Sequence, residues 1–137
     1  MTDVAAFVQK PVRVAFLEEE EGENFCLLAP VAYEVGIIAG IVPARFRTDA
    51  ASIPWWARAF VNKWGKHARA SIVHDWLYTS HPDGIDRRTA DWVFRTLMIR
   101  ACGVNPVKAW ILWGVVRLFG KHPFNNPNPA HMWQGEV

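Results

Sequence analysis

The sequence predicts an α+β fold, in which a small N-terminal antiparallel β-sheet is followed by three to four helices. Two observations predict it. The first 47 residues contain short runs rich in Val, Ile and Phe, separated by Gly and Pro as is typical of strands and turns. From residue 48 onward, apolar residues recur at helical spacing between capping residues. We expect the 137 residues to form a single domain, with a β-rich part over 1–47, a helical part over 48–120 and an irregular tail over 121–137.

Three apolar segments account for the predicted sheet. They are "VRVAFL" (12–17), "FCLLAPVAYEV" (25–35) and "GIIAGIVPARF" (36–46), the last of which carries Gly and Pro at its turns. The acidic run between the first two segments predicts a solvated hairpin loop rather than a metal site, because blocks of like charge usually face water.

The predicted helical part begins with two helices. A short helix is predicted within 48–64, where capping-type residues precede Pro54 at a position that tolerates proline. Residues 66–80 predict the next helix, and Pro82 and Gly84 mark a turn after it.

Two further helices complete the predicted helical part. One spans 86–103, where an apolar stripe runs along one face and Gly103 follows it. The other spans 106–120, with Asn105 as its cap and Gly120 at its end, and its apolar faces are broad enough to pack on more than one side.

Charge, composition and cysteine content give further expectations about partners and location. The formal net charge is +2 and the basic residues are scattered, so no specific nucleic-acid partner is expected. The chain begins without the pattern of a signal peptide, and it has no apolar window of membrane-spanning length. Cys26 and Cys102 have apolar neighbours, so we expect free buried thiols.

The segment "SIVHDWLYTS" places chemically active residues in an apolar helix. His74 and Tyr78 are four residues apart and share one face, whereas Asp75 is rotated by about 100°. If the following turn covers 80–85, Asp91 stands at the height of His74 on the next antiparallel helix. We therefore expect a His74–Asp91 pair, with Tyr78 donating to the same carboxylate.

This arrangement has two interpretations. An aspartate that accepts a hydrogen bond from one imidazole nitrogen leaves the other nitrogen free to act as a general base, and Asp75 would be available to a metal ion. Buried His, Asp and Tyr also commonly form a structural network between two helices. The spacing alone does not decide between a catalytic site and such a network.

The order "HDWLY", a short connector and "AD" resembles the active-site hairpin of phospholipase A2 enzymes, most closely the compact bacterial and parvoviral forms. The resemblance implies that His74 activates water, that Asp91 orients it with help from Tyr78, and that Asp75 binds calcium. Calcium takes about six to eight oxygen ligands, so further ligands are needed. Asp49, within "RTDAASIP", is the candidate second ligand, and capping of the following helix is its alternative role.

A second resemblance covers more of the chain. The segments "IVPARFRTDAASIPWW", "HDWLY", "RRTADWVFRTLM" and "VVRLFG" are similar to a family of small proteins of unknown function encoded by tailed bacteriophages and prophages. This resemblance implies a phage or prophage origin, with the protein in the host cytoplasm or in the phage particle.

Two alternative functions are therefore expected. The first is a metal-assisted hydrolase of phospholipase A2-like type that acts on an ester or acyl bond, with calcium as cofactor and a phospholipid or membrane surface as partner. The second is a non-enzymatic virion or accessory protein that binds phage structural proteins through a Trp-rich surface. Trp55 and Trp56 are adjacent and cannot both face inward on one helix, which favours them over Trp110 and Trp113 as that surface.

Overall fold

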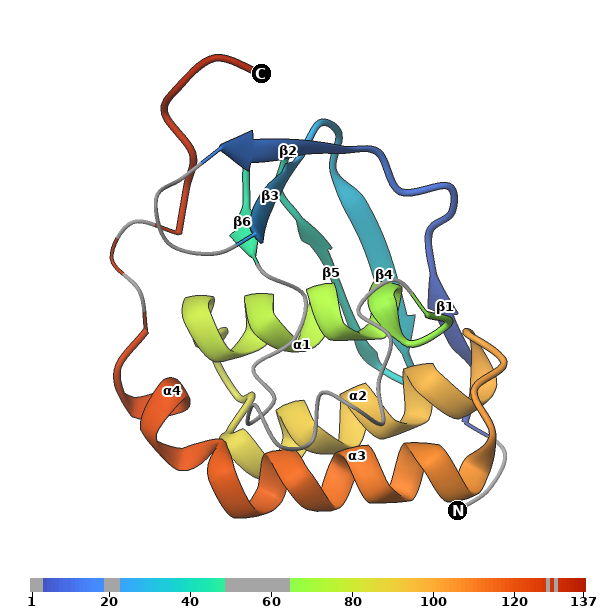
Figure 1. Cartoon of the computed structure of the whole chain (residues 1–137). Helices are drawn as coiled ribbons and strands as arrows, with labels where there is room; N and C mark the ends of the chain where they lie inside the picture. Colours follow the sequence, from blue (N-terminus) through green and yellow to red (C-terminus); the bar gives the residue numbers. More distant parts are fainter. Residues whose placement is uncertain (1–3, 19–22, 49–64, 128, 130) are drawn as a thin grey trace.

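The computed structural model of the chain describes residues 4–18, 23–48, 65–127, 129 and 131–137. In these residues six strands precede four helices, which confirms the predicted α+β fold (Figure 1). The strands form two three-stranded antiparallel sheets, where one small sheet was expected.

The first sheet has the order β1-β4-β5. Its strands are β1 (Ala6–Val8), β4 (Val31–Val35) and β5 (Ile38–Val42). Alternate residues of β4 are buried, because successive side chains of a strand point to opposite faces. Gly36 joins β4 to β5 with a φ of 60°, a conformation that favours glycine.

The second sheet has the order β2-β3-β6. Its strands are β2 (Val14–Glu18), β3 (Glu23–Leu27) and β6 (Arg47–Thr48). The segment 25–35 is thus divided between the two sheets, with Pro30 in the gap, where its missing N–H costs no ladder bond. The acidic run connects the paired strands β2 and β3, although its residues 19–22 lie outside the described residues.

The helices lie in layers against the strands. They are α1 (Ala68–Ser80), α2 (Arg87–Arg100), α3 (Pro106–Phe119) and α4 (Lys121–Asn125). Figure 1 shows α1 nearest the strands, α2 beneath it and α3 at the base, so that α1 and α2 form the predicted hairpin. As predicted, Asn105 caps α3 by accepting a hydrogen bond from the Val107 N–H. The helix expected within 48–64 falls almost entirely on residues 49–64, which lie outside the described residues.

The prediction of an irregular tail over 121–137 is wrong at its start. Helix α4 follows α3 directly, and its Phe124 packs edge-on against Tyr78, with 5.2 Å between ring centroids. Such tertiary packing stabilises a short helix that local propensity does not predict. Further along, Met132 forms an isolated bridge with Phe46.

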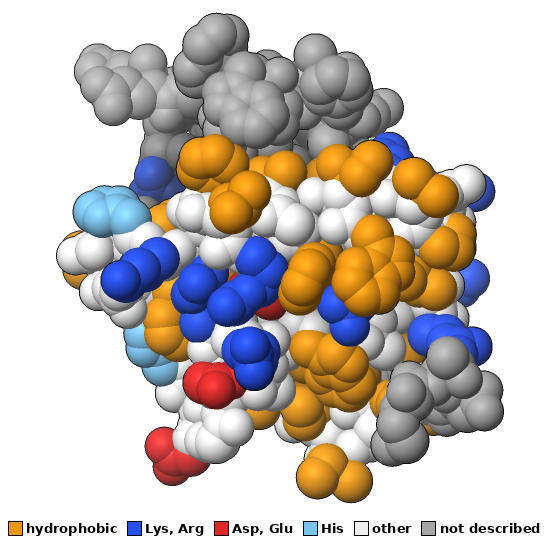
Figure 2. Space-filling model, turned by 90° about the horizontal axis from the view of Figure 1, so that it is seen from below, with side chains coloured by type: hydrophobic (Ala, Val, Ile, Leu, Met, Phe, Trp, Pro, Cys, Tyr) orange, Lys and Arg blue, Asp and Glu red, His pale blue; other side chains and the backbone are white. Residues whose placement is uncertain are grey.

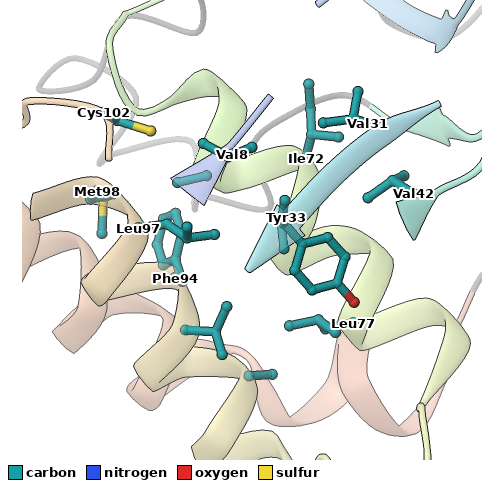
Figure 3. Packing of buried hydrophobic residues seen from close by; sticks show 14 of the residues in the cluster. Val8, Val31, Tyr33, Val42, Ile72, Leu77, Phe94, Leu97, Met98 and Cys102 are labelled. Carbon is teal, nitrogen blue, oxygen red and sulfur yellow. The ribbon is translucent and has the colours of Figure 1, made fainter. Parts of the chain in front are cut away.

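One hydrophobic core joins the described strands and helices. Figure 3 shows Val8 and Tyr33 from the first sheet facing side chains of α1 and α2, among them Leu77 and Phe94. Cys26 and Cys102 are buried free thiols, as predicted. Among the described residues, no helix is long and apolar enough to cross a membrane.

Among the described residues, helix α3 buries its side chains mainly toward α2, although its apolar faces were expected to be broad enough to pack on more than one side. Its buried residues are Ala109, Leu112 and Val116, all on the side toward α2. The other apolar side chains of α3 contact the core less closely or are exposed. A broad apolar surface therefore remains on the outside of the helical layer.

His67, just before α1, is a buried polar residue with an unusual environment. Its exposure is 0 %, and among the described residues its two ring nitrogens are the only buried side-chain polar atoms without a hydrogen-bond partner. Burial, together with the positive charge of Lys108, lowers the pKa of His67 from 6.5 to about 4. The folded protein therefore holds this ring neutral where an unfolded chain would protonate it.

This histidine makes the stability of the protein dependent on pH. Between pH 6.5 and 4 the unfolded chain binds a proton that folded His67 does not, so the free energy of unfolding should fall as the pH decreases. The loss should be on the order of 3 kcal/mol. Urea unfolding across this range, on the parent and on His67→Leu, measures it. We expect the leucine variant to lack most of the slope and the exposed-histidine control His122→Gln to keep it. An unchanged slope in His67→Leu would contradict the assignment.

Candidate functional site around Asp91

The centre of the candidate site is the carboxylate of Asp91, which α2 carries on its buried face. Its exposure is 0 %. Oδ1 lies 2.7 Å from Nε2 of His74 and accepts a 2.6 Å hydrogen bond from the hydroxyl of Tyr78. Both partners come from α1, so the predicted contact across the helical hairpin is present.

Two arginines complete the surroundings of the carboxylate. Nη1 of Arg117, on α3, donates a 2.7 Å hydrogen bond to Oδ2 of Asp91. Nη1 of Arg87 lies 3.7 Å from the same oxygen and also donates to the carbonyl oxygens of Val116 and Arg117. Arg87 thereby binds two carbonyl oxygens at the end of α3, and that of Val116 also accepts a hydrogen bond from the Gly120 N–H. One carboxylate therefore connects three helices.

The protonation states within the network follow from these contacts. Burial by itself raises the pKa of Asp91, but hydrogen bonds from His74, Tyr78 and Arg117 and the charge of His74 outweigh it and lower the pKa. Burial and the hydrogen bond to Asp91 raise the pKa of Tyr78. Asp91 is therefore an ionised acceptor and Tyr78 a neutral donor at neutral pH.

An ionised Asp91 determines the tautomer of neutral His74. Nε2 must carry the proton that it donates to Oδ1, which leaves the lone pair on Nδ1. The imidazole ring lies between Tyr78 and Phe94, at 4.1 and 4.7 Å between ring centroids, so its orientation is fixed. This is the arrangement in which an imidazole can take a proton from water.

Access to His74 is narrow. The side chain of His74 is 8 % exposed. Nδ1 makes no hydrogen bond to a described residue.

Gly120 lies against the hydroxyl of Tyr78 in the Asp91 network. A Cβ atom at this position would lie 2.5 Å from the Tyr78 hydroxyl oxygen and would also collide with the backbone oxygen of Val116. Only glycine leaves room for Tyr78 to reach Asp91 in this geometry. Arg117 and Gly120 both belong to "VVRLFG", so this segment serves the same network as "HDWLY".

Of the two residues predicted to bind a metal, only Asp75 lies among the described residues. Asp75 is partly buried on α1 and is rotated away from Asp91, as expected from its position, while Asp49 lies outside the described residues. The described part of the chain contains no group of three His, Cys, Asp or Glu side chains placed to hold a metal ion. Calcium takes about six to eight oxygens, so its binding through Asp75 stays a prediction.

Sequence reasoning identified three members of the network and missed two. His74, Tyr78 and Asp91 follow from helical spacing and a short turn, whereas Arg87 and Arg117 were not predicted. The i, i+4 spacing of Arg87 and Asp91 was one available signal. The other was the arginine in "VVRLFG", a segment already singled out by its resemblance to phage proteins.

The family described as "Protein of unknown function (DUF1353)" matches residues 25–116, about two thirds of the chain. The chain therefore belongs to this family. The matched region contains His74, Tyr78 and Asp91 and ends one residue before Arg117. No curated protein and no solved structure matched the chain.

Two glycines of the same helical layer test the geometry around Tyr78. Gly120→Ala should destabilise the protein by about 1–3 kcal/mol, because the new methyl group displaces the Tyr78 hydroxyl from Asp91. Gly114→Ala is the matched control, since nothing lies within 4 Å of its added Cβ, and it should stabilise α3 by about 1 kcal/mol. Thermal or urea unfolding measures both. Equal effects of the two substitutions would refute the close approach of Tyr78 to Gly120.

Proposed function

We propose that this member of the DUF1353 family is a hydrolase that uses His74 as general base to activate water for attack on an ester or related acyl bond. The supporting observation is the geometry of Asp91, which accepts from Nε2 of His74 and leaves Nδ1 as the only basic nitrogen of the ring. Tyr78 and Arg117 are positioning residues, because they hold the carboxylate rather than face the solvent side of His74.

The proposed step needs only a proton transfer at Nδ1. Water gives a proton to Nδ1 as its oxygen attacks the carbonyl carbon, and the ring becomes an imidazolium whose Nε2–H remains hydrogen-bonded to Asp91. The ionised carboxylate stabilises this positive charge, as an aspartate does for a catalytic histidine elsewhere. The same proton can then pass to the leaving oxygen when the acyl bond breaks.

The role of calcium stays a separate proposal. It rests on the resemblance of "HDWLY" to phospholipase A2 enzymes, which implies Asp75 as a ligand, and on Asp49 as the candidate second ligand. The phospholipid substrate and the phage or prophage origin rest on resemblance in the same way. The proton transfer at His74 does not depend on either of them.

A structural role is the second candidate. The observation that favours it is the number of groups around Asp91, which receives hydrogen bonds or ion pairs from side chains on α1, α2 and α3. A buried carboxylate saturated in this way can serve to hold the three helices together. The protein would then be a non-enzymatic virion or accessory protein that binds phage structural proteins.

A hydrolysis assay separates the two candidates. Phospholipids and simple acyl esters are offered with and without calcium to the parent, His74→Gln and Asp75→Asn, each shown to be folded by circular dichroism. We expect His74→Gln to lose roughly 10²- to 10⁴-fold in rate, as is usual when a general base is removed. If calcium takes part through Asp75, Asp75→Asn should lose the calcium-dependent fraction of the rate.

His122→Gln is the control, because His122 is exposed on α4 and lies outside the network. It should keep the activity of the parent. Full activity in a folded His74→Gln variant would refute His74 as the base. A folded parent that hydrolyses none of the substrates, with or without calcium, would favour the structural role.

A further inference from the structure

The outward side of α3 is apolar where a surface helix is normally polar. Four side chains project from it: Val107, Trp110, Ile111 and Leu118, which are exposed by 68, 51, 60 and 78 %. At 100° per residue they fall within one sector of the helix, opposite the buried residues Ala109, Leu112 and Val116. This sector contains no charged residue, so α3 presents two apolar faces and buries only one of them.

We name this sector the α3 face, defined by Val107, Trp110, Ile111 and Leu118. Exposed apolar clusters of this kind mark surfaces that bind a partner or a membrane. The charges and side chains around the α3 face indicate whether it binds a protein or a membrane.

The surroundings of the α3 face are positively charged. Helices α2, α3 and α4 carry four, two and one Lys or Arg residues, and their only acidic residue is Asp91, which is fully buried. Figure 2 looks at this underside of the molecule, where orange and blue side chains lie beside one another across the centre and red is seen mainly at the lower left. Lys108 lies at one edge of the α3 face itself, and Arg117, which is hydrogen-bonded to Asp91, lies at the other.

Arg95 and the tryptophans add a feature suited to a boundary between water and lipid. The Arg95 guanidinium lies 4.0 Å from the ring centroid of Trp110 and 4.8 Å from that of Trp113. Tryptophan prefers the interfacial region of a membrane, and an arginine stacked on it can meet lipid headgroups while the ring contacts the apolar layer below.

We propose that the α3 face docks on the surface of a membrane that contains anionic phospholipids. Apolar side chains on the helix enter the boundary between headgroups and acyl chains, and the flanking cations pair with the headgroups. Helix α3 has 14 residues and lies along the outer layer of the fold, so it is suited to lie in the plane of the interface.

A second copy of the chain is a weaker occupant. A symmetric pair formed through the α3 face would bring the basic edges of both copies together, and like charges at an interface oppose association. An anionic surface neutralises the same residues. Charge therefore favours lipid over self-association.

The docking proposal does not require that the protein is a hydrolase. The α3 face is separate from Nδ1 of His74, and the His74→Gln substitution leaves every residue of the α3 face unchanged. Membrane binding and hydrolysis can consequently fail independently, and vesicle binding is measured on the parent and on His74→Gln alike.

Vesicle co-sedimentation tests the proposal with a matched pair of variants. Ile111, on the α3 face, and Ile41, on β5, are both 60 % exposed, so Ile111→Ser and Ile41→Ser make the same chemical change at equal exposure. The probes are vesicles of phosphatidylglycerol mixed with phosphatidylcholine and vesicles of phosphatidylcholine alone. We expect the parent, His74→Gln and Ile41→Ser to bind the anionic vesicles, and added salt to weaken binding.

Ile111→Ser should bind the anionic vesicles about tenfold more weakly, as expected for the loss of one buried aliphatic side chain. Three results would overturn the proposal. They are no binding of the parent to anionic vesicles, equal binding of Ile111→Ser and Ile41→Ser, and a parent dimer that Ile111→Ser converts to a monomer. The last result would identify the α3 face as an interface between copies.

Discussion

The helical part of this protein depends on the requirement that a buried carboxylate be neutralised and hydrogen-bonded. An ion of this kind is costly to bury unless charged and polar groups surround it, and removal of one partner leaves the rest unpaired. Asp91 meets the requirement with His74 and Tyr78 on α1, Arg87 on α2 and Arg117 on α3. These contacts fix the position of α1 and α3 relative to α2 and give His74 its orientation.

The part of the site that the sequence predicted is the part that local geometry determines. Helical periodicity places His74 and Tyr78 on one face, and a short turn brings Asp91 opposite them. Arg117 lies 26 residues beyond Asp91 on a different helix, so its contact depends on how α3 packs against α2. The spacing of residues does not encode that packing. The close approach of Gly120 to Tyr78 also depends on helix packing, so the spacing of residues does not predict it.

The limits of the fold prediction have equally specific causes. The predicted segments contain most of β2 and β3 and all of β4 and β5, whereas β1 and β6 lie outside them. The division into two sheets depends on the pairing of β1 with β4 and of β6 with β3, which are distant in sequence. For α3, apolar periodicity could not distinguish a second buried face from an exposed one. The structure shows that Trp110 is half exposed, whereas Trp55 and Trp56, which were expected to form the aromatic surface, lie outside the described residues.

The catalytic and structural interpretations share the Asp91 network, and both require that Nε2 of His74 donates its proton to Asp91. The most direct measurement is therefore the tautomer of His74 by ¹⁵N NMR of histidine-labelled protein in its neutral form. Our account predicts a protonated Nε2 and an unprotonated Nδ1, with loss of this preference in Asp91→Asn. A neutral His74 protonated on Nδ1 in the parent, or a tautomer unaffected by Asp91→Asn, would contradict it.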